Sequence, residues 1–306
     1  MIKRETIMEK NILEIGTFTR FAGLIGHPVE HTLSPYLQGR LAAHTGTDLA
    51  YFAFDVKEDE LEKAIEGGRA LSAFGYNVTA PYKKAVMKYL DGIDDDAKAI
   101  GAVNTVKYDN GKAYGYNTDV YGFMQTLITE GIDIKGGNAV IIGAGGVSNA
   151  VIAGCLKLGA ANILVVNRTK AKAEALIADF KDRAGDTRLY ASGLDEDYIK
   201  IMDETGKQDK WTALHCTSLG MHPDEDGLAI TDEDFYKRVS AGMDMIFNPS
   251  ETRFMKCVKD AGGKAVNGLK MLIYQGVKSF NIWTGVKVSE ETIKKLLEDM
   301  PGLLKG

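Results

Sequence analysis

Hydrophobic and polar positions follow two different periods along this chain. Short apolar runs, several of them rich in branched or aromatic residues, predict buried strands. These runs lie at 21–26, 49–56, 73–79, 139–142, 163–166, 211–216 and 243–247. In the segments between them, apolar positions recur at helical spacing. The predicted helices span 34–44, 58–66, 83–90, 97–101, 119–131, 151–158, 171–180, 194–205, 252–260, 269–283 and 289–299. Strands that alternate with helices predict the α/β class.

Two dipeptides in the first 120 residues predict local structure. Ser34-Pro35 predicts a helix start, with Ser34 as the N-cap and Pro35 at the first helical position. Asn110-Gly111 lies between two strand-like segments and predicts a β-hairpin with a type I′ turn.

A glycine-rich turn follows the fourth predicted strand. Gly143, Gly145 and Gly146 precede the next helix, and the strand at 163–166 completes a βαβ unit. Gly143 allows a tight turn, and Gly145 lets the backbone come close to a pyrophosphate at the helix N-terminus. The third glycine of this dinucleotide fingerprint is replaced by Ser148, which is small enough to be accommodated.

The end of the strand at 163–166 indicates which dinucleotide binds. An NAD site places an acidic residue about 20 residues past the turn, but this chain has Asn167, Arg168 and Thr169, followed by Lys172. A guanidinium can hold a 2′-phosphate bidentately, whereas a carboxylate would repel it. We therefore expect NADP(H) rather than NAD. The alternative is that Arg168 and Lys172 belong to a solvated helix start.

Composition narrows the class of protein. The 306 residues suggest two domains, and a net charge of −5 with interspersed acids and bases argues against nucleic acid as the main partner. The three cysteines are isolated, which predicts no metal site and fits a reducing cytoplasm. No apolar run reaches membrane length, and the first 20 residues lack the apolar core of a signal peptide, although Met8 is an alternative start.

Polar side chains gather just beyond predicted strand ends, where ligands of open α/β sheets bind. One stretch carries Asn77, Thr79 and Lys83, and another carries Asn104 and then Thr118-Asp119. Each of these residues alone is typical of a cap or a turn. Their combination favours a functional site.

Nine motifs resemble those of the shikimate/quinate dehydrogenase family, in the same order. They are HTLSP at 31–35, NVTAPYK at 77–83, GAVNT at 101–105, NTD at 117–119, GAGGVSNA at 143–150, NRT at 167–169, TSLGM at 217–221, FNPSETRFM at 247–255 and GLKMLIYQG at 268–276. They cover nearly everything from Phe21 to the C-terminus, so they are far more specific than the glycine fingerprint alone.

The resemblance implies two α/β domains and a reaction. Residues 1–121 would be the substrate-binding domain, completed by the C-terminal helices of 268–306, and 122–267 would be a Rossmann-type NADP-binding domain. The implied reaction is the reversible, NADPH-dependent reduction of 3-dehydroshikimate to shikimate in chorismate biosynthesis. The expected partner is this small molecule rather than a nucleic acid or a membrane, and a homodimer is a candidate assembly.

The resemblance also assigns roles to residues. Lys83 would be the acid–base group, with Asp119 paired to it and in contact with substrate hydroxyls; a purely structural salt bridge is the alternative. Thr32 and Ser34 would hold the substrate carboxylate, and Thr79, Asn104 and Gln275 its ring hydroxyls. The implied cofactor contacts are Gly143, Gly145, Gly146, Val147, Ser148, Asn167, Arg168, Thr169, Lys172, Thr217, Ser218, Leu219, Met221 and Gly268.

Four positions depart from the family pattern. Thr32 replaces the usual serine, Gln38 a histidine, Phe247 a tyrosine, and His215 an asparagine, and we expect His215 to be a packed residue. The loss of the tyrosine hydroxyl and the added methyl of Thr32 bear on which related acid is preferred. A quinate/shikimate dehydrogenase and a non-catalytic relative are therefore the alternatives, the latter disfavoured because both Lys83 and Asp119 are present.

Overall fold

The computed structural model describes residues 15–206 and 210–304, and these form two compact units. Unit 1 comprises the described residues up to Gly122 together with those from Ile273 onward, and unit 2 is Phe123–Leu272. The predicted α/β class with two units and returning C-terminal helices is confirmed. The chain passes between the units after residues 122 and 272, where we predicted 121 and 267. Met8, the alternative start, lies outside the described residues.

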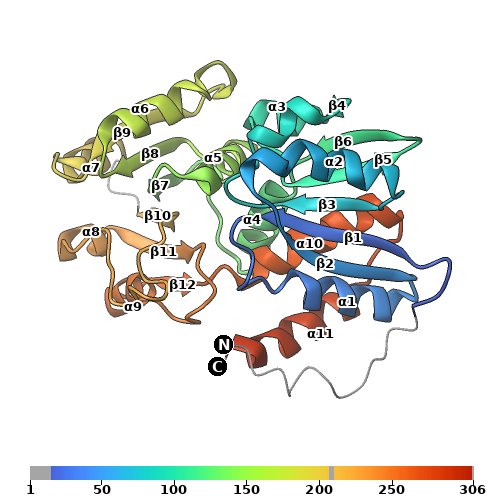
Figure 1. Ribbon diagram of the computed structural model, residues 1–306. Coiled ribbons are helices and arrows are strands. Elements are labelled where there is room, and N and C mark those ends of the chain that lie inside the picture. Colours follow the sequence, from blue (N-terminus) through green and yellow to red (C-terminus); the bar gives the residue numbers. More distant parts are fainter. Residues whose placement is uncertain (1–14, 207–209, 305–306) are drawn as a thin grey trace. The chain divides into compact units, whose positions relative to one another are not determined.

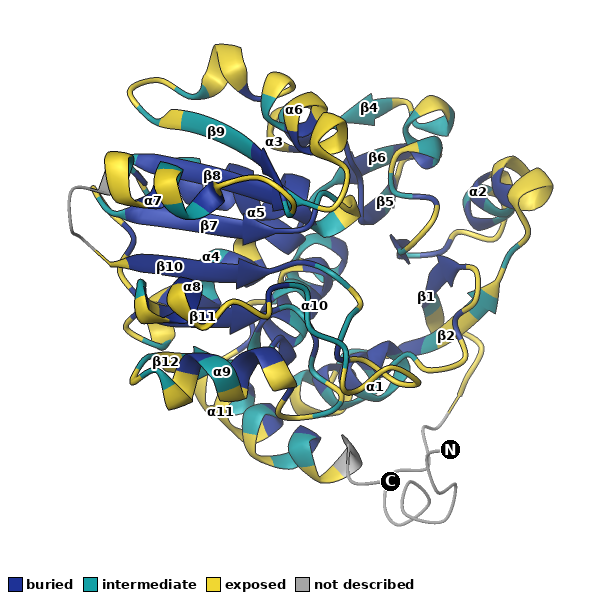
Figure 2. Ribbon diagram, turned by 90° about the vertical axis from the view of Figure 1, so that its left-hand side faces the viewer, coloured by how far each residue is buried: buried dark blue, intermediate teal, exposed yellow. Residues whose placement is uncertain are grey.

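Unit 1 is built on a six-stranded sheet in the order β2-β1-β3-β5-β6-β4 (Figure 1). Its strands are β1 (Arg20–Gly26), β2 (Leu49–Asp55), β3 (Gly75–Val78), β4 (Gly92–Ile93), β5 (Thr105–Asp109) and β6 (Lys112–Tyr116). Its helices are α1 (Ser34–Thr45), η2 (Glu58–Glu60), α2 (Leu61–Ala70), η3 (Ala85–Tyr89), α3 (Asp95–Ile100), α10 (Leu269–Thr284), α11 (Glu290–Asp299) and η5 (Met300–Leu304). Strand β1 pairs in parallel with both β2 and β3, and α2 and α10 cover opposite faces of the sheet (Figures 1 and 2).

The hairpin of unit 1 confirms a turn predicted from two residues. Strands β5 and β6 pair antiparallel, and Asn110 and Gly111 between them have φ values of 49° and 74°. Two successive positive φ values define the type I′ turn, which twists in the sense that the strands require.

Unit 2 holds a second six-stranded sheet, in the order β12-β11-β10-β7-β8-β9, with every pair parallel. Its strands are β7 (Asn138–Ile142), β8 (Asn162–Asn167), β9 (Arg188–Gly193), β10 (Trp211–His215), β11 (Val239–Asp244) and β12 (Lys264–Val266). Its helices are α4 (Asp119–Thr129, which starts in unit 1), α5 (Gly146–Lys157), α6 (Lys170–Ala178), η4 (Lys181–Arg183), α7 (Tyr198–Gly206), α8 (Glu233–Lys237) and α9 (Arg253–Asp260). Every residue of β7 and β10 is buried (Figure 2), because helices cover both faces of a parallel sheet.

Two local predictions were wrong, the N-cap at Ser34 and the bounds of the strand at 243–247. Ser34 is not the N-cap: it is the first residue of α1, and the hydroxyl of Thr32 accepts a hydrogen bond from its N–H. The helix predicted at 83–90 is present as the short 3₁₀ helix η3. The strand predicted at 243–247 is β11, which begins earlier because its pairing with β10 and β12 extends over the weakly apolar residues Ser240 to Gly242.

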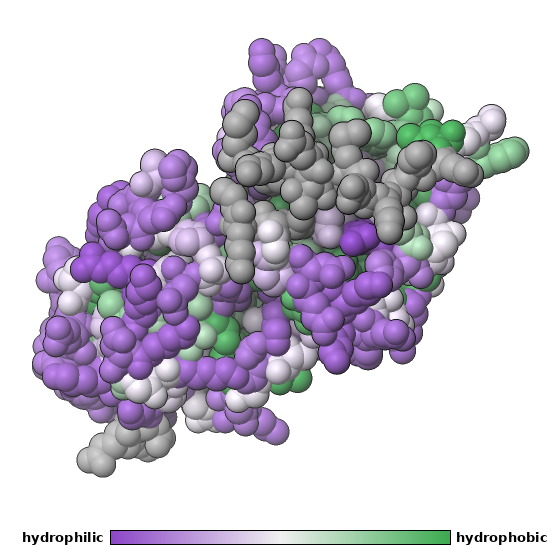
Figure 3. All heavy atoms as spheres, turned by 90° about the horizontal axis from the view of Figure 1, so that it is seen from below, coloured by the Kyte–Doolittle hydropathy of each residue, from purple (hydrophilic) through white to green (hydrophobic). Residues whose placement is uncertain are grey.

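Hydrophilic side chains cover most of the described surface on the face drawn in Figure 3, and hydrophobic ones gather in a few smaller areas. None of the described helices combines the length and the apolar character that a bilayer crossing requires.

Candidate functional site

Lys83 and Asp119 form an ion pair in unit 1. Lys83 follows β3, Asp119 is the first residue of α4, and the Nζ–Oδ2 distance is 2.7 Å. Their side chains are 24% and 11% exposed, so the pair remains accessible to a small molecule. The two predicted catalytic groups are therefore brought together, in a setting where solvent screens the charges only in part.

Asn104 fixes the carboxylate of this pair. Its Nδ2 donates to Asp119 Oδ1 at 2.8 Å and to Thr118 Oγ1 at 3.0 Å, and its Oδ1 accepts from the Thr118 N–H at 2.7 Å. Asn104 is buried, so these bonds hold both its own amide and the first residue of α4 in one orientation.

Ser279 is a junction that the sequence did not reveal. It is fully buried on α10, and its Oγ lies 2.9 Å from Asn77 Nδ2, 2.8 Å from Thr105 Oγ1 and 3.1 Å from Thr118 Oγ1. The Ser279 hydroxyl also donates to the backbone carbonyl of Gln275, one turn earlier in α10. The side-chain Oε1 of Gln275 lies 3.5 Å from Thr118 Oγ1. The available signal was the i, i+4 spacing of Gln275 and Ser279, which puts both side chains on one side of the helix.

Tyr51 is a second unpredicted member of this cluster. Its hydroxyl donates to Asn77 Oδ1 at 2.8 Å. Burial raises the pKa of Tyr51 well above its ordinary value, and a hydrogen bond with Ser34 works in the opposite direction. Tyr51 thus stays protonated and connects β2 to β3. Within the strand pattern of 49–56, nothing marked it as more than one of several aromatic residues.

Thr32 and Ser34 occupy the other end of the cluster. The Thr32 hydroxyl donates to Ser34 Oγ at 3.1 Å, so the two predicted carboxylate ligands lie side by side. A separate hydrogen-bonded path leads from Tyr51 to the ion pair, and it includes the predicted substrate residue Asn104. The path runs through Tyr51, Asn77, Ser279, Thr118, Asn104, Asp119 and Lys83.

Thr79 lies at the end of β3, outside this path. Its backbone N–H donates to the carbonyl of Ile25 at 2.9 Å, and a Cβ at Gly26 would lie 2.3 Å from its methyl group. Its hydroxyl has no hydrogen-bond partner among the described residues. It is therefore available to a ligand, as predicted for a group that binds a ring hydroxyl.

The glycine turn of unit 2 is shaped for close backbone approach. Gly143 has φ +105°, and a Cβ there would lie 2.8 Å from the methyl of Thr217 and 3.1 Å from the carbonyl of Cys216. The buried Ser148 donates from Oγ to the Gly143 carbonyl at 3.0 Å, so this replacement of the third glycine stabilises the turn. Gly145, the N-cap of α5, and Gly146 are exposed, which leaves the helix N-terminus open to an anion.

Two exposed cationic side chains follow the end of β8. Asn167 accepts from the Ala144 N–H at 3.2 Å and donates to the Thr169 carbonyl at 2.9 Å, which ties this strand end to the glycine turn. Arg168 and Lys172 are exposed and have no ion-pair partner among the described residues. Both are therefore available for a phosphate.

Lys170 provides a contrast in the same turn of α6. Its Nζ lies 2.8 Å from Glu196, which holds the pKa of that carboxyl below its usual value. The charge of Lys170 is thus already matched within the chain.

The loop after β10 lies beside the glycine turn. Thr217 Oγ1 is 2.6 Å from His215 Nε2 and accepts from the Leu219 N–H at 3.2 Å. Ser218 and Met221 are exposed. Val147, in the first turn of α5, is partly exposed.

Gly268 lies just before α10. A Cβ there would lie 2.2 Å from the Met245 carbonyl, so this position requires glycine.

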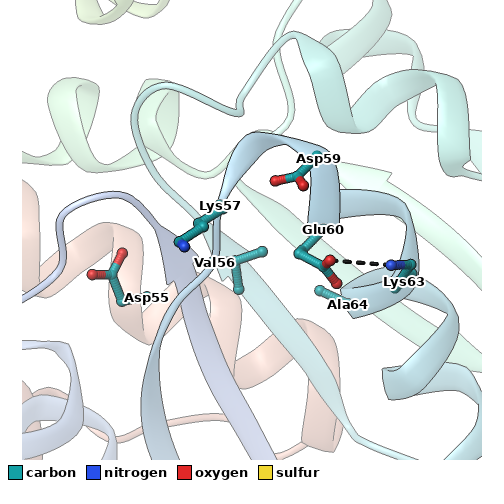
Figure 4. Close-up of a pocket in the computed structure, with 7 residues that line it drawn as sticks. All are labelled: Asp55, Val56, Lys57, Asp59, Glu60, Lys63 and Ala64. Carbon is teal, nitrogen blue, oxygen red and sulfur yellow. Dashed lines mark hydrogen bonds and ion pairs between the residues drawn. The ribbon is translucent and has the colours of Figure 1, made fainter.

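A separate surface pocket of unit 1 lies between the end of β2 and α2 (Figure 4). It is lined by Asp55, Val56, Lys57, Asp59, Glu60, Lys63 and Ala64, none of which is a predicted site residue. Glu60 is paired with Lys63 at 3.0 Å, and Asp55 with His27 at 2.6 Å. Among the described residues no group of three or more acidic, histidine or cysteine side chains is arranged to hold a metal ion. We read this pocket as a solvated charged surface.

Family comparisons match three parts of the chain. Residues 24–106 match the family described as Shikimate dehydrogenase substrate binding domain, and 126–194 the family described as Shikimate / quinate 5-dehydrogenase. Residues 268–298 match the Shikimate 5'-dehydrogenase C-terminal domain.

Similar proteins align over almost the whole length. A protein of Methanococcus aeolicus named shikimate dehydrogenase (NADP(+)) is 41% identical, over 94% of this chain and 99% of its own. A crystal structure of a shikimate dehydrogenase in complex with NADP+ is 40% identical, with a TM-score of 0.82, and covers 94% of this chain and 97% of the other. The Listeria monocytogenes shikimate 5-dehydrogenase in complex with shikimate and NAD is 31% identical, with a TM-score of 0.84, and covers 93% and 98%.

Proposed function

We propose that this chain, which belongs to the shikimate dehydrogenase family, catalyses the reversible NADPH-dependent reduction of 3-dehydroshikimate to shikimate. The observation that carries the proposal is the Lys83–Asp119 pair, because ketone reduction needs a proton donor at the carbonyl oxygen. The pair is partly exposed and adjoins a set of hydroxyl and amide groups suited to a polyol.

In the reducing direction, the Lys83 ammonium delivers a proton to the substrate oxygen or stabilises the negative charge that develops there. Asp119 keeps Nζ in place through one carboxylate oxygen, while Asn104 holds the other oxygen. In the oxidising direction, the neutral amine form of Lys83, which the reducing step leaves, accepts the proton of the hydroxyl. The positions of these groups are set before substrate arrives, which lowers the cost of organising the charges at the moment of reaction.

The substrate carboxylate is assigned to Thr32 and Ser34, and the ring hydroxyls to Thr79, Asn104 and Gln275. This division is supported by chemistry: the paired hydroxyls at the start of α1 can donate to a carboxylate. Amide groups such as those of Asn104 and Gln275 can both donate to and accept from a hydroxyl.

The residues of unit 2 fit NADP(H), which supplies the hydride when bound. The glycine turn and the N-terminus of α5 suit its pyrophosphate, and Arg168 with Lys172 suits the 2′-phosphate. We assign Asn167 and Thr169 to the same end of the cofactor. The loop residues Thr217, Ser218, Leu219 and Met221, together with Gly268, are assigned to the nicotinamide end.

A four-way assay tests this function. Shikimate and quinate are each paired with NADP+ and NAD+, and reduced cofactor is followed at the ~340 nm absorbance that marks hydride transfer to a nicotinamide. We expect the shikimate and NADP+ pair to react fastest. Faster turnover of quinate would instead favour the alternative that Thr32 and Phe247 suggested, and absence of turnover in all four pairs would contradict the proposal.

We also place the enzyme in the cytoplasm as a homodimer. All three cysteines are free thiols, as is usual in a reducing compartment, and burial raises the pKa of Cys216 to about 12.

Sedimentation velocity of the purified chain measures the assembly, and a monomer at every concentration would contradict the dimer.

A further inference from the structure

A buried histidine–aspartate couple lies at the end of two neighbouring strands of unit 2. The parallel register pairs His215 of β10 with Asp244 of β11. His215 Nδ1 lies 3.0 Å from Asp244 Oδ1, and the side chains are 2% and 0% exposed. A charged group is seldom buried to this extent unless it is fully hydrogen-bonded.

The couple is held rigidly from several sides. Asp244 Oδ1 also accepts from the Ile246 N–H at 3.0 Å, and Oδ2 accepts from Thr252 Oγ1 at 2.6 Å. Phe254 stacks on the imidazole, with ring centres 5.1 Å apart and planes inclined by 21°. The position and the plane of the His215 ring are therefore both fixed.

The free side of the imidazole points to Thr217. Because a carboxylate only accepts hydrogen bonds, Nδ1 of His215 carries the hydrogen, and Nε2 of a neutral ring is an acceptor. The Thr217 hydroxyl then donates to Nε2 at 2.6 Å, and its oxygen accepts from the Leu219 N–H. The methyl group of Thr217 is the atom that a Cβ at Gly143 would strike at 2.8 Å.

We propose that His215, held by Asp244, is a positioning residue for the cofactor site and acts through Thr217. It orients the hydroxyl of Thr217 away from the glycine turn and the methyl toward it, and so sets the shape of the loop at 217–221. This inference rests on the proposed function, since it takes that loop to contact NADP(H). It predicts that His215 determines cofactor affinity rather than shikimate affinity.

A purely structural role is the competing explanation. A buried, stacked histidine contributes to stability wherever it lies, so loss of stability alone would not support the proposal. The two explanations differ in the dissociation constant of NADPH, which a structural residue would leave unchanged in the folded variant.

The test compares Thr217→Val, Thr217→Ser, His215→Phe, which keeps an aromatic ring but removes both ring nitrogens, and the double variant His215→Phe/Thr217→Val. Each is titrated with NADPH, using the fluorescence of the reduced nicotinamide to obtain the dissociation constant. The Michaelis constants for NADP+ and shikimate and the melting temperature are measured alongside. His44→Asn removes an exposed histidine of unit 1 and serves as the control.

Thr217→Val and His215→Phe should each raise the NADPH dissociation constant about tenfold, the effect of one lost hydrogen bond. Thr217→Ser should stay within about twofold of the wild type, because it keeps the hydroxyl. The double variant should be no weaker than the worse single variant, since both changes break one connection. The Michaelis constant for shikimate should not change.

Wild-type NADPH affinity in folded Thr217→Val and His215→Phe, with only a lower melting temperature, would overturn the inference. If His215→Phe does not fold, Thr217→Val still overturns the inference when it binds NADPH as the wild type does, because it exchanges a hydroxyl for a methyl of similar size on a partly exposed residue. If the wild type itself does not bind NADPH, the proposed function fails rather than this inference alone.

Discussion

Units 1 and 2 assemble their polar groups in different ways. In unit 1 the candidate substrate residues are joined by side-chain hydrogen bonds between segments far apart in the chain, with Ser279 meeting Asn77 across 202 positions. In unit 2 the candidate cofactor residues rely more on backbone shape: Ser148 supports the Gly143 carbonyl, and the Asn167 side chain accepts from the Ala144 N–H. A polyol needs many individually placed donors and acceptors, whereas a pyrophosphate needs only an open helix N-terminus.

The comparison predicts that a substitution in one unit should affect either the substrate or the cofactor, but not both. Changes in the unit 1 cluster should affect shikimate, and changes in the β8–α6 region of unit 2 should affect the cofactor. Four experiments follow, in order of decreasing expected effect.

The largest effect is expected for Lys83→Ala. Removing the proton donor should lower kcat by about 10²–10⁴-fold, the usual contribution of general acid–base catalysis. Steady-state kinetics with shikimate and NADP+ measure it. Lys84→Ala is the matched control, because Lys84 is the next residue, is exposed and lacks the ion pair. A Lys83→Ala variant with wild-type kcat would show that the ion pair is structural.

A smaller effect is expected for the double variant Arg168→Ala/Lys172→Ala in unit 2. Loss of charged hydrogen bonds to the 2′-phosphate should raise the Michaelis constant for NADP+ about 10- to 100-fold. The constant for NAD+, which lacks that phosphate, should hardly change. Lys181→Ala, which removes another exposed cation of unit 2, is the control. An equal rise in the Michaelis constants for NADP+ and NAD+ would mean that the 2′-phosphate binds at another place.

Ser279→Ala in unit 1 should destabilise the fold by about 1–3 kcal/mol, because Asn77 and Thr118 lose a buried partner. It should also raise the Michaelis constant for shikimate while leaving that for NADP+ unchanged. Urea unfolding and the same kinetics measure the two effects, and Ser250→Ala, at an exposed position, is the control. A rise in the Michaelis constant for NADP+ instead would contradict the proposal that substitutions in unit 1 affect only shikimate.

The two units also differ in how far they could be predicted. The glycine turn, Arg168 and the βαβ unit follow from residues close together in the sequence, and the Asn110-Gly111 turn follows from two residues. Tyr51 and Ser279 could not be identified, because each looks like one member of an apolar element until its partner Asn77 is known.

The same reason explains why strand β11 was misplaced. Its register depends on pairing with β10, whereas the prediction considered only the hydrophobicity of the segment itself. His215 was correctly expected to be packed, but its partner Asp244 lies 29 positions away and belongs to this misplaced strand. A local sequence pattern therefore does not reveal contacts between segments that are distant in the sequence.

The smallest effect concerns acid stability in unit 1. The Ala113 N–H and the Arg69 guanidinium hold the pKa of Asp91 below its usual value. The unfolded chain therefore binds a proton more readily than the folded one as pH falls. The stabilisation from this carboxylate is present above the unfolded pKa, ~3.9 for an aspartate, and is lost as pH falls through the lower folded value.

Asp91→Asn should thus reduce the free energy of unfolding slightly at pH 6 and flatten its decline between about pH 4 and 3. The effect should be small because solvent screens this exposed site. Urea unfolding across this range measures it, with Asp186→Asn, an exposed aspartate of unit 2, as the control. Asp91 joins α2 to the strands β4 and β6. If the free energy of unfolding of Asp91→Asn declines in acid as it does in the wild type, these hydrogen bonds form equally well in the unfolded chain. Only the buried network would then distinguish unit 1 from unit 2.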